Sequence, residues 1–168
     1  MHLRGSCHCQ RVVFEVDCDC PVPFLHCYCS ICRKTSGGAG CLVNLGGSYA
    51  SLTILRGEGD VRAYRARVDA EDGAPGRPSE HRRYFCTYCG SHLWAWNAEW
   101  PDLVHPVAAA IDTPLPEPPS RAHMMVRSAP PWARPSSGPG DSTHDGYPPF
   151  SLRSWHEARG LLSPSDDG

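Results

Sequence analysis

The sequence of 168 residues contains no long hydrophobic run. A membrane-spanning helix needs about 20 consecutive apolar residues, and no segment approaches that length. Residues Met1 to Ser6 also lack the apolar stretch that forms the centre of a signal peptide. We therefore expect a soluble protein in the reducing environment of the cytoplasm, with no membrane partner.

The chain has no marked excess of charge of either sign. Its formal net charge is -2, Lys34 is its sole lysine, and the arginines are scattered. The largest basic groups, Arg82–Arg83 and residues 62–67, are too small to form a nucleic-acid groove. We expect no nucleic-acid partner, and interpret Arg82 and Arg83 as charges on a solvated strand face.

Helix signals are few, whereas short extended segments are frequent. With 16 Gly and 17 Pro, turns interrupt nearly every segment, which favours a mainly β domain. Strands are predicted for β-branched and aromatic segments at residues 12–16, 41–45, 51–55, 61–64, 83–85, 92–96, 104–111 and 123–126. One short helix is predicted over residues 154–162.

Two segments have the composition of loops. Residues 67–80 carry little apolar content, and residues 130–149 are rich in Pro, Gly and Ser, with Trp132, Tyr147 and Phe150 available to hold the segment to the surface. We expect one domain over residues 1–150, followed by a short C-terminal tail over residues 151–168.

The ten cysteines are the main chemical feature. Seven of them form three tight clusters: Cys7 and Cys9; Cys27, Cys29 and Cys32; and Cys86 and Cys89. CxC and CxxC spacings bring thiolates together on one soft metal, typically zinc. A disulfide framework is the alternative, but the missing signal peptide and the chain length favour metal. Tetrahedral zinc takes four ligands, so seven thiols could form a closed site and a group of three with one position open.

The clusters and their surroundings resemble a known family, the glutathione-dependent formaldehyde-activating enzymes, which include the centromere protein V-like proteins. The resemblance rests on four motifs in order: Gly5-Ser6-Cys7-His8-Cys9, Cys27-Tyr28-Cys29-Ser30-Ile31-Cys32-Arg33-Lys34, Phe85-Cys86-Thr87-Tyr88-Cys89-Gly90-Ser91, and the segment from His123 to Trp132. It extends from about Gly5 to Phe150.

This resemblance implies a fold and two metal sites. The fold would be a twisted β-sheet sandwich of the Mss4-like type, stabilised by zinc. One structural zinc would be held by Cys7, Cys9, Cys86 and Cys89. A second, catalytic zinc would be held by Cys27, Cys29 and Cys32, which gives two zinc ions per chain.

The implied activity is that of a carbon–sulfur lyase. A small-molecule thiol such as glutathione would bind at the open position, lose its proton, and add to formaldehyde or a related small aldehyde. The product with formaldehyde is S-(hydroxymethyl)glutathione, and the reverse reaction cleaves the carbon–sulfur bond. No acid or base is recognisable in the sequence. A non-catalytic zinc-stabilised module of the same family is the alternative. A generic zinc ribbon fits less well, because its CxxC pairs lie close together in sequence and its surface is basic or aromatic.

Other residues near the motifs are interpreted as structural. Cys18 and Cys20 depart from the family pattern, and Cys41 is expected to be a buried small hydrophobe. His8, His26, His92 and His123 are expected to form hydrogen bonds, and Trp94, Trp96, Trp100 and Trp132 to pack. Arg33 or Lys34 could attract an anionic substrate or be solvated surface charges.

Overall fold

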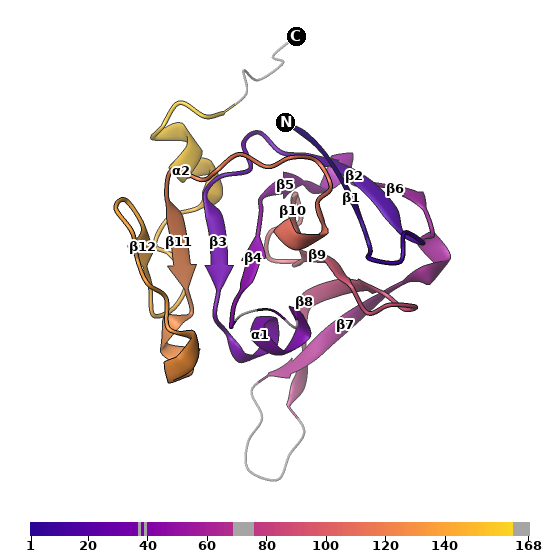
Figure 1. Cartoon of the computed structure of the whole chain (residues 1–168), viewed down its shortest axis with the longest axis horizontal. Helices are drawn as coiled ribbons and strands as arrows, with labels where there is room; N and C mark the ends of the chain where they lie inside the picture. Colours follow the sequence, from indigo (N-terminus) through magenta and orange to yellow (C-terminus); the bar gives the residue numbers. More distant parts are fainter. Residues whose placement is uncertain (37, 39, 69–75, 163–168) are drawn as a thin grey trace.

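The computed structural model describes residues 1–36, 38, 40–68 and 76–162, and their architecture is mainly β. Twelve strands in this part of the chain form three sheets (Figure 1). The prediction of a mainly β fold is confirmed.

The first sheet contains the N-terminal strands β1 (His2–Ser6) and β2 (Val13–Asp17) together with β6 (Thr53–Arg56), all antiparallel. Phe14 and Val16 on β2 are fully buried. The ring of Phe14 packs 5.0 Å from that of Trp94, and Trp94 in turn stacks on Tyr84 at 5.4 Å. These aromatic contacts join the first sheet to the second.

The second sheet has five antiparallel strands in the order β5 (Gly47–Ser48), β10 (Leu103–Pro106), β9 (His92–Trp96), β8 (Arg77–Cys86) and β7 (Val61–Val68). Strands β7 and β8 form a long hairpin that extends away from the rest of the molecule (Figure 1). The ends of β8 therefore lie in different environments, one in the core and one in the hairpin.

The third sheet has the order β12 (Ser142–Thr143), β11 (Arg121–Met124), β3 (Phe24–Cys27) and β4 (Leu42–Asn44). Strand β11 is parallel to both β12 and β3, whereas β3 and β4 are antiparallel. The register places Met124 opposite Cys27, the last residue of β3.

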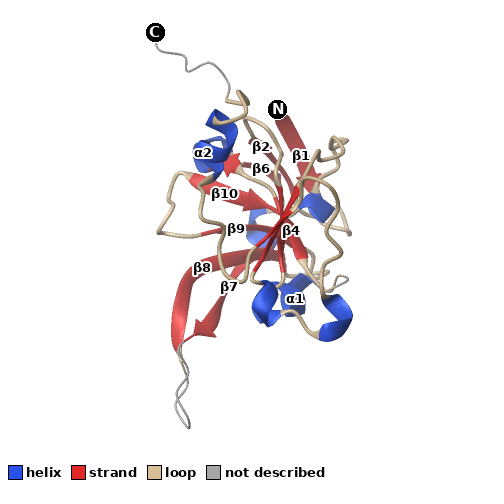
Figure 2. Cartoon of the chain, turned by 90° about the vertical axis from the view of Figure 1, so that its left-hand side faces the viewer, coloured by secondary structure: helices blue, strands red, loops and turns tan. Residues whose placement is uncertain are grey.

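Two short α-helices, α1 (Ser30–Ser36) and α2 (Leu152–Glu157), lie at opposite ends of the molecule (Figure 2). Ser151 and Ser154 form a reciprocal capping box at the start of α2, and Trp155 and His156 are buried. No helix in the described ranges is long and apolar enough to span a membrane. The 3-10 helices are η1 (Tyr49–Ser51), η2 (Glu58–Asp60), η3 (Ala108–Ala110), η4 (Val126–Ser128) and η5 (Pro131–Ala133).

Several predicted boundaries need correction. Strand β7 continues to Val68 and β8 begins at Arg77, so the predicted loop over residues 67–80 is wrong at both ends, and residues 69–75 lie outside the described residues. The predicted strand over 104–111 ends at Pro106 and gives way to η3. The predicted helix over 154–162 is observed earlier, as α2. Strands β1, β3, β5 and β12 and helix α1 were not predicted, and β12 lies within the segment 130–149 that was predicted to be a loop.

Candidate metal centres

The first cysteine cluster is built from two hairpin turns. Cys7 and Cys9 lie in the turn between β1 and β2, and Cys86 and Cys89 lie where β8 turns into β9. A residue with positive φ follows each pair, Gln10 at 62° and Gly90 at 74°, and its N–H donates to the carbonyl of the first cysteine of the pair. Such tight turns direct neighbouring sulfurs to one point.

The four sulfurs of this cluster lie within 4.8 Å of one another, although Cys9 and Cys86 are far apart in sequence. The Sγ atoms of Cys7 and Cys9 are 3.4 Å apart, and those of Cys9 and Cys86 are 3.9 Å apart. A tetrahedral ion with Zn–S bonds of about 2.3 Å requires sulfurs about 3.8 Å apart. All ten cysteines of the chain are free thiols. The donor set and its spacing therefore fit a zinc ion.

The second cluster contains the other three cysteines of the motifs. Cys27 ends β3, Cys29 immediately precedes α1, and Cys32 lies within α1. Their sulfurs also lie within 4.8 Å of one another, and the N–H of Cys32 donates to Sγ of Cys29 at 3.3 Å. Hydrogen bonds from the thiols of Cys27 and Cys32 lower the pKa of Cys29 to about 2. The cluster therefore offers three convergent sulfur donors and could hold a metal ion.

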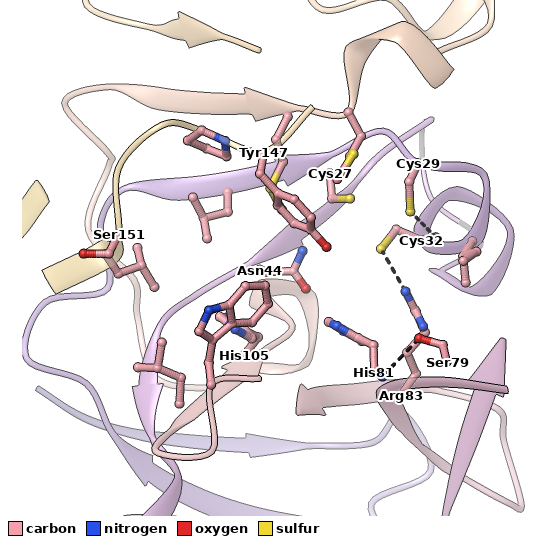
Figure 3. A pocket seen from close by; sticks show the side chains of 18 of the residues that line it. Cys27, Cys29, Cys32, Asn44, Ser79, His81, Arg83, His105, Tyr147 and Ser151 are labelled. Atoms are coloured by element: carbon pink, nitrogen blue, oxygen red, sulfur yellow. Dashed lines mark hydrogen bonds between the residues drawn. The ribbon is translucent and has the colours of Figure 1, made fainter. Parts of the chain in front are cut away.

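The three sulfurs line a cavity of about 570 Å³ (Figure 3). This volume is within the range of small-molecule sites. Apolar side chains from β3, β10, the end of β11, the segment before α2 and the start of α2 form much of the wall: Leu25, Leu103, Met124, Met125, Pro148, Pro149 and Leu152. The polar part includes Asn44, Ser79, His81, Arg83, His105, Tyr147 and Ser151.

Comparisons with known proteins identify the family of the chain. The sequence model described as "Glutathione-dependent formaldehyde-activating enzyme" matches residues 2–128. A Halomonas elongata protein named "Putative glutathione-dependent formaldehyde-activating enzyme" is 44% identical over 161 residues, covering 96% of this chain and 98% of the relative. The chain belongs to the glutathione-dependent formaldehyde-activating enzyme family.

A solved Rhodobacter sphaeroides protein, a structural genomics target, is also similar to this family member. It has a TM-score of 0.49 and 20% sequence identity, over 67% of this chain and 91% of the other. Its title states no activity.

Two histidines of this family member face the cavity beside the second cluster. Nδ1 of His105 on β10 lies 3.2 Å from the carbonyl oxygen of Leu45. A carbonyl oxygen can only accept, so Nδ1 carries the proton and Nε2 of the neutral ring has a free lone pair. Burial lowers the pKa of His105, and burial followed by the charge of Arg83 lowers the pKa of His81 to about 4. Both imidazoles are therefore neutral at neutral pH.

Arg83 corrects the interpretation of the Arg82–Arg83 pair. Arg83 is only 6% exposed, and its Nη2 donates to Sγ of Cys32 at 3.9 Å. Arg82 instead stacks over the ring of Trp96, with Cζ at 5.3 Å from the centroid. Side chains alternate along a strand, so adjacent arginines face opposite sides of β8. This orientation could not be predicted from the sequence, because which face of β8 points inward depends on sheet packing.

The other candidate residues lie outside both sulfur groups. Cys41 is half-buried, with Sγ 3.7 Å from Nδ1 of His26, and neither Cys18 nor Cys20 belongs to a sulfur group in the described residues. His123 is buried between Tyr28 and Asp141. Its Nδ1 lies 3.1 Å from Oη of Tyr28, and its Nε2 lies 3.5 Å from Oδ2 of Asp141. Of the other two histidines near the motifs, His8 is exposed and His92 is buried. Neither Arg33 nor Lys34 lines the cavity of the second cluster.

Proposed function

We propose that this protein catalyses the addition of glutathione, or a related thiol, to formaldehyde or a related small aldehyde, and the reverse carbon–sulfur cleavage. The observation that carries the proposal is the position of Cys27, Cys29 and Cys32, whose sulfurs converge at the wall of a cavity large enough for a small molecule. The family of the chain and the name of its 44% identical relative support the same substrates.

The two sulfur groups have different roles in this proposal. Cys7, Cys9, Cys86 and Cys89 hold a structural zinc ion, and the ligand set is complete at four thiolates. Cys27, Cys29 and Cys32 would hold a second zinc ion with three thiolates, which is one ligand fewer than in the group of four. When bound there, zinc supplies a Lewis acid that lowers the pKa of a thiol below its ordinary value.

The cavity residues supply the remaining chemistry. His105 Nε2 accepts the thiol proton, because its Nδ1–H is committed to the Leu45 carbonyl. The sulfur then forms a bond to the aldehyde carbon as the C=O π bond opens. The proton on His105 passes to the new alkoxide oxygen, so the product is a hydroxymethyl thioether and the imidazole is regenerated. The apolar wall, which includes Leu103 and Met124, limits access of water to the reacting atoms.

The test measures formation of S-(hydroxymethyl)glutathione by exchange NMR with ¹³C-formaldehyde. Wild-type protein is compared with Cys32→Ser, with Cys20→Ser as a matched control outside both sulfur groups, and with buffer, because the uncatalysed reaction is fast. We expect acceleration by wild type and Cys20→Ser, and the buffer rate with Cys32→Ser. Equal rates for all samples, across several thiols and aldehydes, would contradict the proposal and favour the non-catalytic module.

A further inference from the structure

The most unusual group in the cavity wall is the guanidinium of Arg83. Arg83 is nearly fully buried, and Nε and Nη1 have no hydrogen-bond partner in the structure as described. Only Nη2 has one, Sγ of Cys32. A buried charge with unsatisfied donors is costly unless a ligand completes it, so this group points to a missing partner.

Within the described residues, no side chain accepts a hydrogen bond from Nε or Nη1 of Arg83. No Asp or Glu is among the described residues that line the cavity, and Arg83 is the only Arg or Lys among them. The nearby histidines are neutral, so the negative charge beside Arg83 in the described lining comes from the sulfurs of the second cluster, which Arg83 contacts through Nη2 alone. The guanidinium lies in the cavity beside Cys32 and is directed toward it (Figure 3). A negatively charged ligand in the cavity would therefore meet Arg83 and no repelling carboxylate.

The chemistry of the guanidinium indicates which anion fits. Arginine presents a planar fork of N–H donors that matches a carboxylate in a bidentate pair. Its contact with Cys32 places this fork next to the sulfur group where the proposed thiol reacts. A carboxylate a few bonds from the thiol sulfur could reach it.

We infer that Arg83 is a specificity-determining residue that binds a carboxylate of the thiol substrate while its sulfur lies at the Cys27, Cys29 and Cys32 group. This inference rests on the proposed function and adds to it a substrate class: thiols that carry a carboxylate, as glutathione does. His81, neutral and two residues before Arg83 on the same face of β8, is placed beside this subsite. Arg33 and Lys34, the cations considered from sequence, do not line it.

The kinetic test compares glutathione with glutathione diethyl ester, which keeps the thiol but lacks both carboxylates. We expect Arg83→Gln to raise KM for glutathione by about tenfold or more, since a charge-assisted hydrogen bond contributes that much to binding. KM for the diethyl ester should change little. Arg82→Gln, on the opposite face of β8, is the matched control and should leave both values unchanged. An equal effect of Arg83→Gln on both thiols would overturn the inference, because Arg83 would then act on the sulfur group alone.

A binding measurement on wild-type protein keeps the test decisive if Arg83→Gln does not fold. S-methylglutathione has both carboxylates but no thiol, so its binding requires no reaction. We expect calorimetry to show that it binds about tenfold more tightly than its diethyl ester. Equal affinities, or no binding of either compound, would overturn the carboxylate subsite. Preferential binding without any turnover of glutathione and formaldehyde would uphold the subsite and contradict the proposed function, so the two failures are distinguishable.

Discussion

The two sulfur groups of this protein use the same side chain in opposite surroundings. The group of four joins two hairpin turns, and backbone N–H and hydroxyl groups such as Val12 N and Ser91 Oγ lie against its sulfurs. The group of three lies where a strand passes into a helix, and it faces a cavity with imidazole and guanidinium groups. Under the proposed function, the number of sulfurs and the nature of their neighbours, rather than the residue type, would separate the structural group from the reactive one.

The largest expected difference between the groups is in stability. Replacing Cys86 by Ser should prevent folding or make the protein insoluble, because structural zinc binding contributes on the order of 10 kcal/mol in small metal-binding domains. Replacing Cys29 by Ser should leave most of the fold intact and abolish the second metal site. Thermal unfolding and metal content measure the two effects. Equal destabilisation by Cys86→Ser and Cys29→Ser would contradict the division of roles.

The second expected difference is in metal exchange. We expect two zinc ions per chain by mass spectrometry, since the seven sulfurs divide into four and three. A chelator should remove one ion faster than the other, because an open site exchanges ligands more readily than a closed one. In Cys32→Ser protein the fast phase should be missing and the slow phase retained. A content of one zinc in carefully purified wild-type protein would disprove the two-site proposal.

The smallest of these effects concerns His105, the proposed proton acceptor in the cavity beside the group of three. His105→Asn keeps an amide N–H near the position of Nδ1, where it can donate to Leu45, but removes the basic nitrogen. We expect kcat to fall by about 100-fold while the unfolding temperature changes little.

The pH profile separates catalysis by His105 from a structural role. Because burial lowers the pKa of His105, wild type should keep its activity below the ordinary histidine pKa and lose it as the pH falls through the lowered value. Protonation at lower pH removes the acceptor lone pair. His105→Asn should lack this dependence. An unchanged kcat and acid limb in the variant would show that another group accepts the proton.

The cysteine clusters could be predicted from sequence because CxC and CxxC spacings constrain their sulfurs locally. Strands such as β2 and β9 were equally visible, since their β-branched and aromatic residues favour extended backbone. Helix α1 lacks a repeating apolar face, and its first turn is capped by Sγ of Cys29, which no propensity scale includes. Strand β3 directly follows Pro21 and Pro23, and proline is disfavoured in strand interiors, which weakens the local strand signal.

The polar cavity wall could not be predicted for a different reason. His81 and Arg83 come from β8 and His105 from β10, and these strands are brought together by β9 between them. Their convergence depends on sheet order and register, which are long-range properties. The sequence shows their residue types but not which face each side chain takes.

Strand β8 supplies one member of the group of four and part of the cavity wall beside the group of three. Its alternate residues Ser79, His81 and Arg83 line the cavity, whereas Cys86, three residues after Arg83, belongs to the group of four. Slippage of a strand by one residue exchanges its two faces. The pairing of β8 with β9 shifts register between Tyr84 and Phe85, so Arg83 and Cys86 lie on opposite sides of this shift. A metal ion held by Cys9 and Cys86 would fix the end of β8 and so limit slippage of the strand that carries Arg83.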